Sequence, residues 1–364
     1  MSQAQELTTG KGRIGLFLAV SFGLGWALVL PAWWSGAGLG WPVLGAVLPV
    51  MMLAPTLAVL VVWWRARRIA RRHGLRTDWP RRTGLGLGPD RRRTWRVIVA
   101  TWVAVPVLVI VTVVLSAAIG VLHLDLPHLG ALTASSGLAT VERTPGGAAG
   151  VLALTMLQAT ILGTTLTVPF AFGEEWGWRG WLQPELIARW GTTRGLVATG
   201  AIWGLWHAPL TLLGYNYPSL GPWAAVWFLP FSILVALALG PLRQATGSVW
   251  PAVVGHAAIN STAGFGLLVV AADDQPDSAW STIGVVGWVV LAGVVAVLPR
   301  VLRRSTSSRS VGVVLKEDRV ARAGEDGSGQ DPSREGPVAR HGVPRLGPSA
   351  GREADTERTG GPAR

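Results

Sequence analysis

The chain has 364 residues, of which 50% are hydrophobic and only 14% are charged, and its formal net charge is +12 at pH 7. Soluble globular chains carry about 25% charged residues, so this composition, with a mean hydropathy of +0.41, excludes an ordinary soluble enzyme. The absence of cysteine also excludes a disulfide framework, a thiolate metal site and a cysteine nucleophile. Most charged residues lie in two segments, 65–96 and 300–364, so we expect the rest of the chain to lie in a lipid bilayer.

Apolar segments long enough to cross a bilayer recur along the chain. A transmembrane helix needs about 20 residues, because each residue adds about 1.5 Å and the hydrocarbon core is roughly 30 Å thick. The sequence therefore predicts an all-α fold, a polytopic membrane helix bundle with about eight transmembrane helices. The predicted spans are residues 14–34, 41–64, 97–122, 158–183, 195–213, 222–240, 248–271 and 280–299.

The composition outside these spans predicts how the chain is organised. Residues 305–364 mix Gly, Pro, Ser and charged residues with almost no aromatic or periodic apolar pattern, which favours a disordered C-terminal tail. The predicted parts are an N-terminal segment 1–13, N-terminal transmembrane helices within 14–157 with an arginine-rich loop 65–96, a membrane core 158–271, a last transmembrane helix 280–299 and the tail 305–364.

The distribution of arginine predicts the orientation in the membrane. Loop 65–96 carries twelve arginines, and short cationic loops are retained in the cytoplasm. Counting spans from this loop places both termini in the cytoplasm, and we expect a multi-pass protein of the plasma (inner) membrane. Because the basic residues adjoin apolar runs, we interpret them as determinants of topology and as lipid contacts, and we expect no nucleic-acid partner.

Few polar side chains with acid–base chemistry lie inside the predicted spans. An ionisable group inside a span costs about 2.5 to 3.5 kcal/mol on insertion scales, so each one is a candidate functional residue. The candidates are Glu174, Glu175 and Arg179 in the fourth span, His207 in the fifth, and His256 in the seventh, with the neutral amide Asn260 beside it.

Depth along the helices predicts that three proton-transfer groups meet. Hydropathy alone ends the fourth span near Phe172 and leaves the glutamates at the interface, whereas the tryptophans that follow continue the apolar character to Pro184, where we expect the helix to end. Measured from Pro184, Glu174 lies about 15 Å deep at helical rise. His256, nine residues past Gly247, lies about 14 Å deep by the same rule. His207, thirteen residues past Arg194, lies about 20 Å deep, within reach if its helix tilts or starts late.

Spacing within each helix predicts which side chains share a face. Glu175 and Arg179 are four residues apart, the arrangement in which a carboxylate and a guanidinium pair. His256 and Asn260 have the same spacing and are expected to point together into the bundle. Glu174 and Glu175 differ by about 100° around the helix, so we assign Glu175 to holding Arg179 and Glu174 to the chemistry.

Three short runs carry a family resemblance. GEEWGWRG at 173–180, WGLWHAP at 203–209 and HAAIN at 256–260 resemble, in order and separation, the motifs EExxxR, FxxxH and HxxxN of the CAAX-protease and bacteriocin-processing (CPBP, or Abi) family of intramembrane endopeptidases. The resemblance covers about 158–265. Trp203 stands where the family more often has phenylalanine, a change that is conservative for packing and is expected to narrow the cavity.

The resemblance also implies roles for the motif residues. Glu174 with His207 is expected to activate a water for attack on a peptide carbonyl, while His256 with Asn260 stabilises the oxyanion. The family has been described both as metal-dependent and as glutamate-dependent, and Glu174, His207 and His256 are the residues that would hold a zinc ion. We favour the version without a cofactor, because Asn260 is a poor zinc ligand but a good oxyanion donor.

The leading hypothesis is therefore an intramembrane endopeptidase that hydrolyses a membrane-associated or lipidated, CAAX-like polypeptide. Its expected partners are this substrate and the lipid bilayer. One alternative is a proton-coupled transporter in which the same buried groups relay protons, although the two halves of the chain show no matching pattern of interrupted helices. Another is a non-proteolytic membrane scaffold or immunity protein of the same family.

Overall fold

Long apolar helices make up most of the computed structural model, which describes residues 11–302 except 73–78, 137–145, 273 and 275–276. No strand occurs among these residues, which confirms the predicted all-α membrane architecture. Most of the N-terminal segment 1–13 and the whole tail 305–364 lie outside the described residues. Within the described residues, six helical segments are long and apolar enough to span a membrane: Gly12–Trp34, Leu44–Arg72, Arg91–Ala118, Gly147–Trp190, Pro218–Thr246 and Val285–Leu302.

Two of the eight predicted spans are shorter than expected. The predicted span 195–213 contains α12 (Thr192–Trp206), which stops before Pro209, a residue that lacks an N–H and whose ring clashes with the preceding turn. A four-residue helix, α13 (Ala208–Thr211), follows it. The predicted span 248–271 contains α15 (Trp250–Thr262), which tightens into a 3₁₀ segment, η5 (Ala263–Leu268).

The fourth span is longer than predicted and contains two wide turns. It does not end at Pro184, as the sequence indicated, but continues to Trp190. A π-helical stretch precedes this proline, and a wide turn of this kind changes which carbonyl each N–H reaches. Pro184 therefore lies in the first turn of a new α-helical segment that begins at Gln183. The segments are α9 (Gly147–Gln158), the π-helix η2 (Ala159–Gly163), α10 (Thr164–Glu175), the π-helix η3 (Trp176–Leu182) and α11 (Gln183–Trp190).

The second span is broken next to the first motif. Its two parts are α3 (Leu44–Met51) and α4 (Ala54–Arg72), separated by a turn. A Cβ atom on Gly173 would lie 2.7 Å from the carbonyl oxygen of Met52, and one on Gly177 would lie 2.3 Å from Cβ of Pro55. The two glycines therefore let the helix that carries the glutamates approach this break closely.

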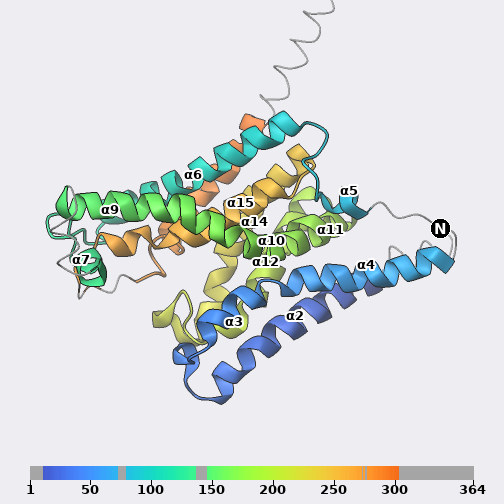
Figure 1. The fold of residues 1–364 in the computed structure, drawn as a ribbon, viewed down its shortest axis with the longest axis horizontal. Helices are drawn as coiled ribbons and strands as arrows, with labels where there is room; N and C mark the ends of the chain where they lie inside the picture. Colours follow the sequence, from blue (N-terminus) through green and yellow to red (C-terminus); the bar gives the residue numbers. More distant parts are fainter. Residues whose placement is uncertain (1–10, 73–78, 137–145, 273, 275–276, 303–364) are drawn as a thin grey trace, which may run out of the picture. The chain divides into compact units, whose positions relative to one another are not determined.

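The remaining helices enclose the segments that carry the motifs. Figure 1 shows α10, α12, α14 (Ala224–Thr246) and α15 at the centre of the helical region, with α2 (Lys11–Trp34) and α4 running along one side. The contacts pair α12 with α14 and α10 with α15. Glycines on α12 permit its close packing, because a Cβ on Gly204 would lie 2.4 Å from Oγ of Ser232 on α14. The other elements are α5 (Trp79–Thr83), α6 (Arg91–Ala118), α7 (Gly130–Ser136) and the 3₁₀ segments η1 (Gly38–Gly40) and η4 (Pro218–Trp223).

Candidate active site

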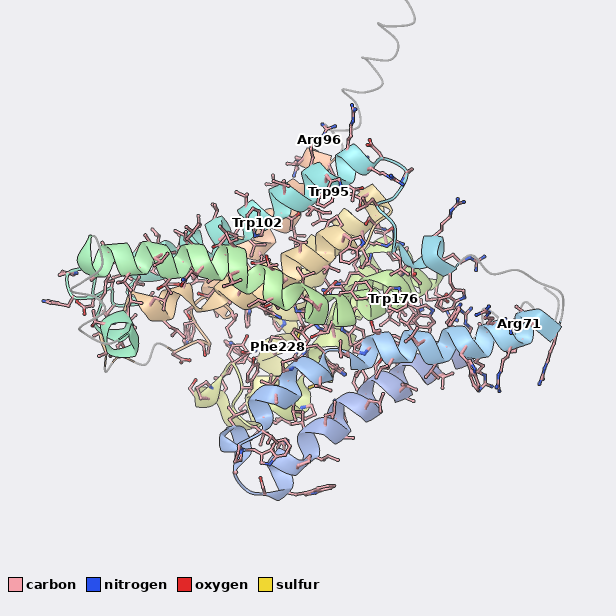
Figure 2. All side chains as sticks on the ribbon, viewed as in Figure 1. Arg71, Trp95, Arg96, Trp102, Trp176 and Phe228 are labelled. Carbon is pink, nitrogen blue, oxygen red and sulfur yellow. The ribbon has the colours of Figure 1, made fainter. Side chains whose placement is uncertain are left out.

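Four candidate residues from three separate helices line one pocket of about 230 Å³. Glu174 comes from the end of α10, His207 from the residue that follows α12, and His256 and Asn260 from α15. Side chains fill the space between the helices around Phe228, which forms part of the pocket wall (Figure 2). The other residues lining the pocket are Leu48, Met51, Met52, Trp203, Trp206, Leu210, Tyr215, Asn216, Phe231, Ile259, Ala263 and Ile283.

The carboxylate of Glu174 is buried and accepts two hydrogen bonds from indole groups. Nε1 of Trp203 donates to Oε2 over 2.6 Å, and Nε1 of Trp178 donates to the same oxygen over 3.2 Å. Among the residues that the structure describes, none donates a hydrogen bond to the second oxygen, Oε1. Glu174 is therefore anchored through one oxygen, while the other has no donor among the described residues.

Glu175 joins two of the motifs through a single oxygen atom. Its Oε1 accepts a hydrogen bond of 2.6 Å from Nη1 of Arg179, so the ion pair predicted from the spacing is present. The same oxygen lies 2.9 Å from Nδ1 of His256, a contact that the sequence did not predict. Because a carboxylate paired with a guanidinium only accepts hydrogen bonds, Nδ1 of His256 carries a hydrogen. Nε2 is then the ring nitrogen left for the pocket's chemistry.

A backbone carbonyl sets the tautomer of His207. Its Nδ1 lies 2.9 Å from the carbonyl oxygen of Trp203, one helical turn earlier. A carbonyl oxygen can only accept, so Nδ1 is the donor and Nε2 of the neutral ring is unprotonated. This arrangement makes His207 competent as a base or as a hydrogen-bond acceptor.

The arrangement of the candidate zinc ligands does not fit a metal ion. Within the described part of the chain, no group of three or more His, Asp or Glu side chains is close enough to hold one. Two indole donors occupy Oε2 of Glu174, an interaction that competes with coordination of a cation by that oxygen. We therefore derive no catalytic step through a metal.

Several residues of the site were not predicted from the sequence. Trp178 lies four residues after Glu174, a helical spacing that would have identified it as a neighbour. Tyr215 and Asn216 line the pocket from the loop after α13, and Asn216 has a positive φ of 71°. Burial raises the pKa of the Tyr215 phenol, and the negative charge of Glu174 raises it further. No short sequence pattern marks this loop.

Together these features define a polytopic helical membrane protein with an acid, two imidazoles and an amide converging on a pocket between its helices. Residues 156–262 match the family described as type II CAAX prenyl endopeptidase Rce1-like. This match confirms the resemblance that the three motifs predict, and every motif residue lies within it. A comparison with curated proteins finds no significant match.

Proposed function

We propose that the protein is an intramembrane endopeptidase that hydrolyses a peptide bond in a membrane-associated or lipidated polypeptide. The observation that carries this proposal is the convergence of Glu174, His207, His256 and Asn260 on one pocket. The family match supports a CAAX-type intramembrane protease at the level of the family.

Glu174 and His207 are the proposed pair that activates water. One of the two proton acceptors, Oε1 of Glu174 or Nε2 of His207, takes a proton while the water oxygen bonds to the scissile carbonyl carbon. The electron pair of the C=O bond moves to the carbonyl oxygen, which becomes an oxyanion. When this tetrahedral intermediate collapses, the C–N bond breaks and the departing amine takes up the proton that the base had removed.

His256 and Asn260 are the proposed donors to the oxyanion. The side-chain amide of Asn260 can donate directly, and Asn260 is an exposed residue that lines the pocket. His256 can donate through Nε2 only as an imidazolium, because Nδ1 already donates to Glu175. The carboxylate of Glu175, 2.9 Å from Nδ1, would be the counter-charge of that imidazolium.

The pocket walls indicate what kind of polypeptide segment can enter. Apart from Glu174 and the two histidines, the lining residues are apolar, aromatic or uncharged polar side chains. A charged segment would lose its hydration there without finding a partner of opposite sign, apart from the acid itself. We therefore propose an uncharged, apolar segment next to the scissile bond, which is consistent with a membrane-associated substrate.

Comparative peptide analysis of membranes tests this proposal. Cells producing the native protein are expected to contain shortened membrane polypeptides that are absent with Glu174→Gln, because a general base contributes about 100-fold or more to the rate. Glu185→Gln is the matched control, since it makes the same chemical change in the following helix segment, outside the pocket. Equal cleavage by Glu174→Gln would refute the proposed base.

Two alternative functions predict different results for substitutions of Glu174 and His207. Accumulation of a solute driven by a pH gradient, lost in Glu174→Gln, would favour a proton-coupled transporter. An unchanged cellular phenotype in a Glu174→Ala/His207→Ala double variant would favour a non-proteolytic scaffold or immunity protein.

A further inference from the structure

Trp203 contacts four of the charged or titratable groups in and beside the pocket. Its indole N–H donates to Oε2 of Glu174 over 2.6 Å, and its backbone carbonyl lies 2.9 Å from Nδ1 of His207. The guanidinium carbon of Arg179 lies 4.7 Å from the centroid of its ring, and the ring of His256 meets it edge-on with centroids 5.4 Å apart. One residue therefore links all three motif segments.

The surroundings of Trp203 hold its ring in place. The side chain is only 4% exposed, and its ring packs against that of Phe228 on α14 with centroids 6.2 Å apart. One residue later, Gly204 brings the backbone of α12 into close contact with Ser232 of the same helix α14. A swing of the indole would need this packing to open, so the N–H has a fixed direction.

The hydrogen bond to Glu174 is the contact that a phenyl ring cannot make. A ring of phenylalanine at this position can preserve apolar packing but has no donor for the carboxylate. The second donor, Trp178, lies farther away, at 3.2 Å. Without Trp203, this longer bond alone would hold Oε2, and the carboxylate would gain rotational freedom about its side-chain torsions.

We propose that Trp203 is a positioning residue that fixes Glu174 for catalysis through its indole N–H. This inference rests on the proposed proteolytic function. By engaging Oε2, the indole leaves Oε1 as the oxygen available to the reacting water. Its backbone carbonyl meanwhile selects the His207 tautomer with an unprotonated Nε2, so the same residue prepares both members of the base pair.

Replacement of Trp203 by 3-benzothienylalanine tests the role of the N–H alone, because sulfur replaces the indole nitrogen while the bicyclic shape is kept. The variant protein in lipid vesicles is expected to show a kcat lower by about 10- to 100-fold with KM nearly unchanged, since a hydrogen bond to a charged catalytic group is lost. Trp203→Phe is expected to lose at least as much.

Trp102→Phe is the matched control for the loss of one indole hydrogen bond, here a partly buried one. Trp102 lies on α6 (Figure 2), and its Nε1 donates to the carbonyl oxygen of Thr160 over 2.9 Å, away from the pocket. We expect its kcat to stay within about twofold of the native value. A kcat of the benzothienylalanine variant equal to that of the native protein would overturn the inference.

An infrared measurement separates failure of this inference from failure of the proposed function. The carboxylate stretching bands of Glu174, identified by their loss in Glu174→Gln, are expected to shift in the benzothienylalanine variant and not in Trp102→Phe. A native protein that cleaves no membrane polypeptide would refute the proposed function, whereas unchanged Glu174 bands in the benzothienylalanine variant would refute the contact with Trp203 independently of cleavage.

Discussion

Glu175 and Arg179 form a buried ion pair in which both side chains are fully inaccessible. The pair is incompletely satisfied, because Oε2 of Glu175 and Nε and Nη2 of Arg179 are buried without a hydrogen-bond partner among the described residues. Removing one partner of such a pair leaves an uncompensated charge in a low-dielectric environment, which costs more than removing both. The stability of the site therefore depends on the two charges being present together.

Glu175→Gln is predicted to lower the free energy of unfolding by about 3 to 5 kcal/mol, because Arg179 keeps its charge and loses its partner. The double variant Glu175→Gln/Arg179→Met is predicted to recover part of this loss. Unfolding in lipid or mild detergent, analysed as a double-mutant cycle, measures both effects. Additive losses for the two substitutions would show that the pair is not coupled.

Asp125 is a second residue whose charge supports local structure, here in the loop between α6 and α7. A hydrogen bond from the ring of His128 lowers the pKa of Asp125 below its ordinary value of 3.8, and the backbone N–H groups of Gly130 and His128 add to the effect. A depressed folded-state pKa means that the stabilisation is present above the ordinary value and is lost as the pH falls through the folded-state pKa.

Hydrogen exchange of the amides in residues 125–131, corrected for intrinsic rates, is therefore predicted to show constant protection from about pH 5 to 7 and a loss below pH 3.8. In Asp125→Asn the protection is predicted to be lower and independent of pH over this range. Identical pH profiles for the native protein and the variant would contradict the role of this carboxylate.

At the level of single residues, sequence reasoning identified the polar groups but not all of their contacts. The cost of burying charge in a span was sufficient to select Glu174, His207 and His256. The contact between His256 and Glu175 and the indole bond from Trp203 to Glu174 depend on how two helices are rotated about their axes, which spacing within one helix does not determine. Trp203 was accordingly interpreted as a packing residue.

At the level of elements, the helix that carries the glutamates depends on glycines for its contact with the broken second span. Gly177→Ala is predicted to destabilise the protein by about 1 to 3 kcal/mol, because its Cβ would lie 2.3 Å from Cβ of Pro55 and the helix would have to shift. The shift is expected to lower kcat as well, since Glu174 lies one turn away.

Gly45→Ala is the control for this substitution, because Gly45 lies within α3 and a Cβ there would meet no atom within 4 Å. Unfolding and cleavage of the two variants are compared under the same conditions. Equal stability and equal kcat for both variants would contradict the close contact at Gly177.

Helix existence was more predictable than helix boundaries. Apolar length alone predicted the long spans, since each must cover the hydrocarbon core. The two π-helical stretches and the break between α3 and α4 were not predicted, because they arise from packing between helices and not from a local composition signal. For the same reason Pro184 was wrongly interpreted as the end of the fourth span, whereas it is accommodated directly after a π-helical segment.

At the level of the whole molecule, the proposed orientation places the arginine-rich ends of the helices in the cytoplasm. Arg71 lies in the last turn of α4 (Figure 2), and Leu126 lies in the loop after α6. The proposed orientation therefore places the two residues on opposite sides of the membrane. The chain contains no cysteine, so single-cysteine variants report position without further substitutions.

In cells whose outer envelope is permeable to the reagent but whose inner membrane is intact, a membrane-impermeant maleimide is predicted to label Leu126→Cys. Arg71→Cys is predicted to stay unlabelled until the inner membrane is permeabilised. Leu126 is 58% exposed, so its reaction should be fast. The reverse pattern would show that the termini lie on the other side of the membrane.

Hydrolysis in ¹⁸O-labelled water tests the central claim, that the acid and imidazoles of three helices form one hydrolytic site. With a cleaved membrane polypeptide as substrate, the native protein is predicted to place one ¹⁸O atom in the newly formed carboxylate during a single turnover, whereas Glu174→Gln and His207→Ala form at least about 100-fold less product. Unlabelled product from the native protein, or product formed at the native rate by Glu174→Gln, would contradict the account.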